Sequence, residues 1–199
     1  MGVSALQYLD QRARFGVKFG LRTTRALLRA LGEPQARYAV LLVAGTNGKG
    51  SVVAYVDAAL RAAGLRVGRY TSPHLVRLNE RIAVGGRAIT DAALERAVRR
   101  VRAAAQDLVR RRRIPDHPTH FEVLTAAALD HFARARVEVA VLEAGMGARL
   151  DATNATQPLA SAIVTVARDH EAWLGRDLAR IAREKAGVLR RGRATVLGP

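Results

Sequence analysis

Short apolar runs alternate along this chain with longer amphipathic stretches, and this alternation restricts the possible folds severely. Apolar runs of strand length are typical of strands that are covered on both faces. The stretches between them have the apolar spacing of helices, so the pattern predicts a mostly parallel sheet with crossover helices on both faces. The expected strands are Tyr38 to Ala44, Arg66 to Tyr70, Val137 to Glu143, Ala162 to Ala167 and Ala194 to Leu197.

Capping and stop signals predict where the helices begin and end. Gly64 takes the C′ position of one helix, and Thr90 is the N-cap of another. Gly85 and Gly86 predict a hairpin at the sheet edge, over Arg81 to Ile89. Residues 1–37 are expected to form a small helical leader within a single domain over residues 1–199. The expected helices are Lys49 to Ala63, Asp91 to Arg112, His120 to Arg134 and Asp177 to Leu189.

Composition narrows the choice of partners and compartment. With 199 residues, 49% of them hydrophobic, the chain can bury a full core. The net charge of +16 comes mainly from arginines that are spread along the helices without interleaved aromatics, which argues against a nucleic-acid partner. The chain has no cysteine, so disulfides and thiolate zinc sites are excluded. Neither a signal peptide nor an apolar segment of membrane-spanning length is visible, and we expect a cytoplasmic protein with no membrane partner.

The stretch VAGTNGKGS, Val43 to Ser51, joins an apolar strand to a helix, which is the context that phosphate binding requires. Its glycines allow the backbone amides to face anionic oxygens, Lys49 can reach the outer phosphates, and Ser51 offers a hydroxyl to magnesium. The turn departs from the common eight-residue pattern, since Gly50 follows the lysine, and an ordinary βα turn is the alternative interpretation. The residues expected to hold ATP are Gly45, Thr46, Asn47, Gly48, Lys49, Gly50 and Ser51.

Two further positions can be interpreted from their residue types alone. Glu143 lies at the carboxyl end of an expected buried strand, where ligands of open α/β sheets bind. A carboxylate there is costly unless it is paired, so magnesium is a natural partner, and a hydrogen bond to the next glycine turn is the alternative. Thr119 and Glu122 form a T-x-x-E capping box at the start of a helix.

Six motifs occur in order along the chain: GTNGKGS, then Tyr70 to Ile82, Thr119 to Glu122, Leu142 to Asn154, Asp169 to Gly175 and Arg183 to Val188. This set resembles folylpolyglutamate synthase and dihydrofolate synthase, within the wider Mur ligase family. The resemblance implies the P-loop-type central domain of a Mur ligase. It also implies an ATP-dependent ligase that adds glutamate to dihydropteroate or to a reduced folate such as tetrahydrofolate, through an acyl phosphate.

The resemblance also implies a catalytic group of Lys49, Glu143, His170 and Lys185. By this resemblance two magnesium ions would be held by Ser51, Ser72, Glu143 and His170, and Lys185 would be carbamylated. The residues alone leave other interpretations open. Ser72 can belong to a plain turn before Pro73, His170 can be structural, and Lys185 can be a surface lysine paired with Glu184.

A pterin pocket is implied in the same way, and Phe121 could stack on the heterocycle. Val17 to Phe19 align with a further part of this pocket. Two positions depart from the family: Ala148 replaces a glycine and would forbid a positive φ, and Arg168 replaces an apolar residue. The residues expected to line the pocket are Thr119, His120, Phe121, Glu122, Leu150, Asp151 and Ala152.

Members of this family continue into a second, carboxy-terminal domain with a Rossmann-like fold, which the sequence up to Pro199 is expected to lack. A nucleotide-binding module that is non-catalytic, or that depends on a partner chain for the missing domain, is therefore the alternative to a ligase that works as a monomer. A kinase or a plain ATPase has only the glycine turn in its favour.

Overall fold

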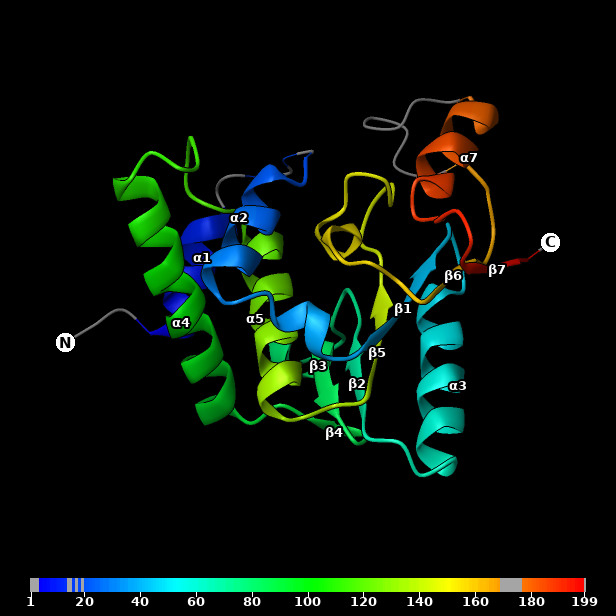
Figure 1. Cartoon of the computed structure of the whole chain (residues 1–199), viewed down its shortest axis with the longest axis horizontal. Helices are drawn as coiled ribbons and strands as arrows, with labels where there is room; N and C mark the ends of the chain where they lie inside the picture. The colour runs from blue at the N-terminus through cyan, green and yellow to red at the C-terminus, as the bar shows by residue number, and fades with distance from the viewer. Residues whose placement is uncertain (1–3, 14–15, 17, 19, 169–176, 199) are drawn as a thin grey trace.

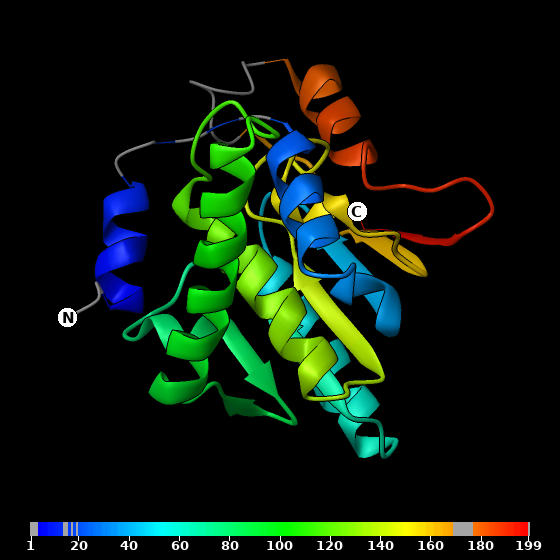
Figure 2. The same ribbon diagram turned by 60° about the vertical axis from the view of Figure 1, so that its left-hand side comes forward.

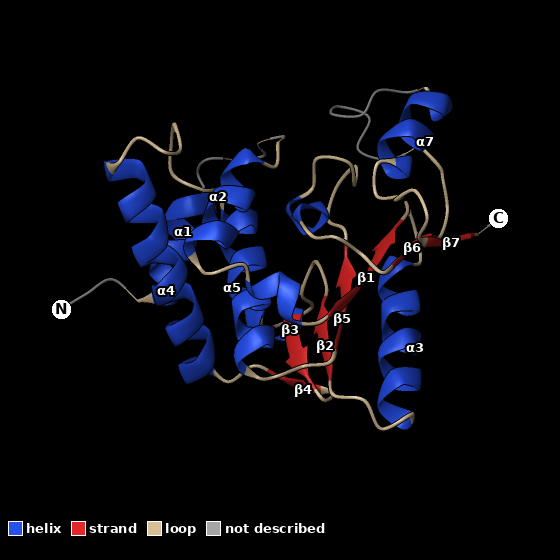
Figure 3. Cartoon of the chain, viewed as in Figure 1, coloured by secondary structure: helices blue, strands red, loops and turns tan. Residues whose placement is uncertain are grey.

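The computed structural model describes residues 4–13, 16, 18, 20–168 and 177–198, which are built around one seven-stranded sheet (Figures 1 and 3). The strands are β1 (Ala39–Ala44), β2 (Val67–Tyr70), β3 (Ile82–Val84), β4 (Arg87–Ala88), β5 (Val139–Glu143), β6 (Ala160–Ile163) and β7 (Ala194–Leu197). The α-helices are α1 (Ala5–Ala13), α2 (Arg22–Ala30), α3 (Lys49–Ala62), α4 (Asp91–Arg110), α5 (His120–Arg134) and α7 (Leu178–Ala186). Short 3-10 helices occupy Pro34–Arg37, Leu78–Arg81 and Ala152–Ala155.

The strand order is β4-β3-β2-β5-β1-β6-β7, and the five strands from β2 to β7 in this order are parallel. The predicted hairpin forms β3 and β4, which add antiparallel strands at one edge. After β1 the chain continues to β2, toward the β4 edge of the sheet. After the neighbouring strand β6 it continues to β7, at the opposite edge. The carboxyl ends of β1 and β6 therefore flank a topological switch point, where ligands of open α/β sheets bind.

Helices cover both faces of the sheet, as predicted. Helix α3 lies on one face, and α1, α2, α4 and α5 lie on the other (Figure 1). The α3 face has a small core in which Val43 and Val141 of the sheet pack with Val53 of the helix. The opposite face carries the larger core, centred on α5, which is buried along most of its length between the sheet and α4 (Figure 2).

Most predicted boundaries are confirmed to within three residues. Thr90 and Thr119 accept hydrogen bonds from the first turns of α4 and α5, as expected of N-caps. The strand predicted over Ala162 to Ala167 is wrong in position, because β6 spans Ala160–Ile163 and residues 164–168 form a loop. Part of this loop bonds to the glycine turn instead of continuing the ladder, which apolar periodicity alone does not reveal.

No helix among the described residues is both long and apolar enough to cross a membrane.

Candidate functional site

The glycine turn leaves β1 at the switch point and opens α3. Gly45 has φ 151° and Gly48 has φ 79°, and a Cβ on Gly45 would come within 3.2 Å of Val164 and Thr165. Gly48 is the N-cap of α3 and has no side chain to satisfy the first turn, and the earliest helical bond of α3 is donated by Val52 to Gly48. The structure records no partner in the described residues for the amides of residues 48–51, so these donors face the position where an anion binds at a helix N-terminus.

A clasp of hydrogen bonds holds the turn against the loop that follows β6. The Thr46 amide donates to the Thr165 carbonyl at 2.9 Å, and the Asn47 amide donates to Thr165 Oγ1 at 2.9 Å. Thr165 Oγ1 in turn donates to the Asn47 carbonyl at 3.1 Å. Thr46 Oγ1 bridges the carbonyl and the amide of Ala167. Two of the amides predicted to face phosphate are thus used to shape the turn.

The Lys49 side chain folds back over the glycine turn. Its Nζ donates to the carbonyls of Gly45 at 3.1 Å and Thr46 at 2.9 Å. Both acceptors are neutral carbonyls, and Nζ lies beside the amides at the start of α3. A lysine in this position can neutralise phosphate oxygens.

Glu143 ends β5 next to the glycine turn, as predicted. It is 5% exposed, and its Oε2 accepts a hydrogen bond from the Ser72 amide at 3.1 Å. A Cβ built on Gly50 would lie 3.8 Å from the same oxygen, so the first turn of α3 passes directly beside the carboxylate. Burial raises the pKa of Glu143, while the Ser72 hydrogen bond and the Lys49 charge act against the rise.

Of the other two residues predicted for the catalytic group, Lys185 is described by the structure and His170 is not. Lys185 lies in α7 and is 3% exposed, so the interpretation as a surface lysine is wrong. The neighbouring Glu184 forms a two-pronged ion pair with Arg149, at 2.9 and 3.0 Å. His170 lies outside the described residues, and within the described ranges no three acidic, histidine or cysteine side chains gather in a metal-binding cluster.

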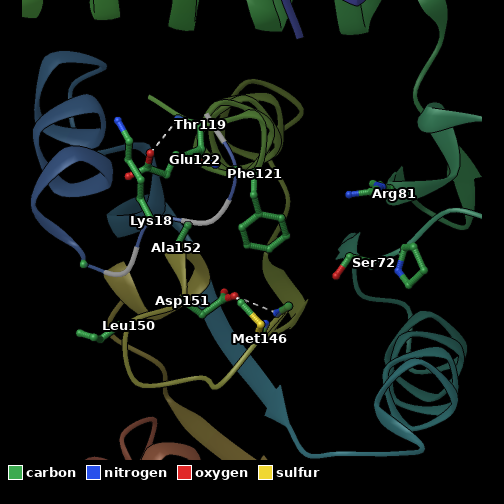
Figure 4. Close-up of a pocket in the computed structure, with 14 residues that line it drawn as sticks. Lys18, Ser72, Arg81, Thr119, Phe121, Glu122, Met146, Leu150, Asp151 and Ala152 are labelled. Atoms are coloured by element: carbon green, nitrogen blue, oxygen red, sulfur yellow. Dashed lines mark hydrogen bonds between the residues drawn. The ribbon is translucent and has the colours of Figure 1, made fainter. Parts of the chain in front are cut away.

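A pocket of about 380 Å³ opens between the start of α5, the loop after β5 and the loop after β2 (Figure 4). It brings together six of the residues predicted to bind the pterin, and Ser72 lines it as well. Those six residues are Thr119, Phe121, Glu122, Leu150, Asp151 and Ala152. Of the segment Val17 to Phe19, only Lys18 is described, and it also lines the pocket.

Phe121 and Asp151 shape the floor of this pocket. The Phe121 ring packs at 6.1 Å from Tyr70, and a Cβ on Gly145 would come within 2.8 Å of it, so only glycine fits at position 145. Both carboxylate oxygens of Asp151 accept bonds from its own loop, from the amides of Gly145 and Met146 and from Thr153. Burial raises the pKa of Asp151, and these donors act against the rise. Asp151 therefore holds the loop in shape.

The predicted capping box at the pocket is confirmed. The Thr119 amide donates to Glu122 Oε2 at 2.8 Å, and the Glu122 amide donates to Thr119 Oγ1 at 3.2 Å. His120 does not line the pocket, because its ring turns to the Leu9 carbonyl at 3.3 Å.

Five other pocket residues were not singled out from the sequence. Arg81, Gly145 and Met146 lie inside quoted motifs, and Gly16 and Gly20 lie in the leader. Arg81 is held by a bond from its Nε to His74 Nδ1 at 2.9 Å. Membership of a motif was the available signal, but only the folded loops show which motif residues face the cavity.

Ala148 overturns one expectation. It adopts φ 102° and is 2% exposed, although alanine was expected to forbid a positive φ. Hydrogen bonds from the amides of Gly145 and Met146 to Asp151 close the loop around Ala148, and alanine is strained in this conformation.

Comparison with known proteins supplies close relatives, although no family model matches the chain. The chain is similar to a protein of Haloferax volcanii described as a probable bifunctional folylpolyglutamate synthase/dihydropteroate synthase, with 46% identity over 185 residues. These residues are 92% of this chain and 22% of that protein. The dihydrofolate synthase/folylpolyglutamate synthase of Bacillus subtilis is 38% identical over 189 residues, 94% of this chain and 44% of the relative.

The chain is also similar to solved structures. An FPGS-AMPPCP-folate complex superposes with a TM-score of 0.91 at 41% identity, over 97% of this chain and 47% of that one. E. coli FolC in complex with DHPP and ADP gives a TM-score of 0.88 at 34% identity, over 98% of this chain and 46% of that one. These superpositions confirm the predicted fold. The chain spans less than half the length of these relatives.

Proposed function

We propose that this chain supplies the nucleotide site and the acceptor pocket of an ATP-dependent glutamate ligase, because more than nine-tenths of it is similar to part of folylpolyglutamate and dihydrofolate synthases. One observation carries the proposal. The Ser72 amide is bonded to Glu143 beside the glycine turn, and Ser72 also lines the pocket next to Phe121. A nucleotide on the turn and an acceptor in the pocket would therefore meet at one residue.

The glycine turn is proposed to bind the phosphates of ATP. The amides at the start of α3, which have no recorded partner among the described residues, and the Lys49 ammonium provide positive charge at the switch point, which supports this role. Solved relatives include complexes with ADP and with AMPPCP, which are ATP-type ligands. A bound γ-phosphate would draw Lys49 away from the carbonyls of Gly45 and Thr46.

Magnesium is proposed to bind at Glu143, with hydroxyl ligands from Ser51 and Ser72. These oxygen donors suit a hard cation, and Glu143 is buried with only the Ser72 amide bonded to its carboxylate in the described part of the chain. A relative has been solved with Mn, AMPPNP and L-glutamate. The metal would neutralise phosphate charge. A second ion held by His170 and a carbamylated Lys185 remain proposals, which the burial of Lys185 supports.

The pocket is proposed to bind the pterin end of dihydropteroate or of a reduced folate such as tetrahydrofolate. Its aromatic wall at Phe121 and its buried acids at Glu122 and Asp151 fit a flat heterocycle that carries polar edges. The acceptor carboxylate would then take the γ-phosphoryl group of ATP and release ADP. The amine of glutamate would displace inorganic phosphate from the acyl phosphate and form the amide.

The second candidate is a nucleotide-binding module without turnover. It is supported by the coverage, because the chain matches less than half the length of its relatives. In that case a partner chain would complete the enzyme, whereas a ligase could act as a monomer. A cytoplasmic location and the absence of nucleic-acid and membrane partners stay predictions.

Phosphate release separates these two functions. Residues 1–199 are assayed with magnesium ATP and glutamate, with dihydropteroate or tetrahydrofolate as acceptor. Lys49→Ala is the test variant. Arg99→Ala is the matched control, because Arg99 is exposed on α4. We expect release that needs both acceptor and glutamate, survives in Arg99→Ala and vanishes in Lys49→Ala. Folded protein that binds ATP but releases no phosphate would establish the binding module instead. Release that is indifferent to the acceptor would contradict the ligase.

A further inference from the structure

A second pocket of about 650 Å³ adjoins the first and shares Leu150 with it. We call it the arginine groove, because it is lined by Arg22, Arg25, Arg29, Arg149 and Arg190. It lies between α2, the loop that follows β5 and the end of α7. None of these arginines takes part in the nucleotide site or the pterin pocket.

Helix α2 presents three of the arginines on one face. Arg22, Arg25 and Arg29 are spaced by three and four residues, so they align along the helix, while Leu27 and Leu28 are buried on the other side. All three arginines are exposed. Within the part of the chain that the structure describes, no ion pair or hydrogen bond is recorded for their guanidinium groups.

The opposite wall of the groove is rigid. Arg190 donates to Asn154 Oδ1 at 2.6 Å and to the Gly187 carbonyl at 3.0 Å, and Asn154 Nδ2 donates to the carbonyls of Arg149 and Gly187. These acceptors are neutral, so Arg190 is held in place without losing its charge. Arg149 alone has an acidic partner, Glu184.

The groove therefore has five arginines and no acidic residue in its lining, and only Arg149 forms a recorded ion pair, with Glu184 outside the lining, in the described residues. Glu33 lines the adjoining pocket with Arg25 and Arg29, yet it forms no recorded ion pair with either in the described residues. Burial and the charge of Arg25 lower the pKa of Arg190. Such mutual repulsion is relieved by a bound anion, and guanidinium groups bind carboxylates or phosphates in pairs of hydrogen bonds.

The number and spread of the arginines decide the kind of anion. One or two arginines are enough for a single phosphate, whereas a row of three on α2 facing two more suits a flexible chain with several negative groups. The groove continues from the proposed pterin pocket across Leu150. We propose that the arginine groove binds the glutamate carboxylates of a polyglutamylated folate, and this inference rests on the proposed function of the neighbouring pocket.

The test compares affinities for folate monoglutamate, folate pentaglutamate and free penta-γ-glutamate, measured by calorimetry with residues 1–199. Arg25→Gln/Arg29→Gln removes two groove charges from an exposed helix face. Arg87→Gln/Arg99→Gln removes two exposed charges from β4 and α4 and is the matched control. We expect folate pentaglutamate to bind about tenfold more tightly than the monoglutamate, because several weak exposed ion pairs act together.

The groove variant should lose this preference to within about twofold, while its affinity for the monoglutamate stays unchanged and the control keeps the preference. Monoglutamate binding without any gain from added glutamates would overturn the groove but leave the proposed function standing. Binding of free penta-γ-glutamate without monoglutamate binding would support the groove and count against the pterin pocket. Equal loss in both double variants, or equally tight binding of tripolyphosphate, would show a non-specific or phosphate site and overturn the inference.

Discussion

Ala148 has a backbone conformation that is rare for any residue with a side chain. At φ 102° its Cβ is crowded by its own backbone, and burial prevents the loop from relaxing. We expect Ala148→Gly to stabilise the chain by about 1 kcal/mol, as measured by urea unfolding. Ala144→Gly is the control, because Ala144 is equally buried and has no positive φ, and it should destabilise the chain by a similar amount. Destabilisation by both changes would show that Ala148 is not strained.

Glu143 links pH to both stability and binding. Burial raises its pKa in the folded state, so the contribution of Glu143 to stability is fully present below its unfolded pKa and is lost as pH rises through its folded pKa. Glu143→Gln should therefore be more stable than the unchanged chain at neutral pH and lose that advantage in acid, as thermal unfolding across pH would show. The same change should weaken magnesium-dependent ATP binding at least about tenfold. Unchanged ATP binding would remove Glu143 from the proposed metal site.

Residues whose roles depend on local signals were predictable from the sequence. Lys49 follows a glycine turn, and Thr119 begins a capping box, so neighbours along the chain define both. Arg81 and the arginines of α2 were not predicted as site residues, because their roles depend on loops that meet only in the folded chain. The φ of Ala148 was also not predicted, because the sequence does not show how hydrogen bonds from Gly145 and Met146 to Asp151 close this loop.

At the scale of elements, the clasp between the glycine turn and the loop after β6 is a distinct device. Thr165 provides both its carbonyl and its hydroxyl to Thr46 and Asn47, which shapes the turn before any ligand binds. We expect Thr165→Val to lower stability by about 1 kcal/mol and ATP affinity by about tenfold, whereas Thr165→Ser keeps the hydroxyl and should retain both. Calorimetry with an ATP analogue would measure the affinity. Equal affinity of the valine and serine variants would mean that the clasp does not position the turn.

The same clasp explains why the position of β6 was predicted wrongly. Apolar periodicity located α5 and β7 correctly, because each packs or pairs along its whole predicted length. It placed β6 too late, because Val164 and the residues after it are apolar enough for a strand but bond to the glycine turn. Tertiary hydrogen bonds overrode the local pattern at the loop that borders the candidate site.

At the scale of the whole molecule, the two proposed sites lie at the carboxyl ends of the parallel strands. The glycine turn lies at the switch point between β1 and β6, and the proposed pterin pocket lies across Glu143 and Ser72 from it. The fold class was predictable because each strand, turn and helix signal indicated the same architecture. The arrangement of the two sites around Ser72 was not, since it depends on how the loop after β2 meets the end of β5.

Calorimetric titration of magnesium AMPPNP into residues 1–199, with folate absent or saturating, tests directly whether the proposed nucleotide site and acceptor pocket are filled together. Lys49→Ala is measured beside the unchanged chain. We expect the analogue to bind with magnesium in both conditions, folate and analogue to bind together, and Lys49→Ala to weaken analogue binding at least about tenfold while folate binding persists. Equal analogue affinity in Lys49→Ala, or displacement of the analogue by folate, would contradict this expectation.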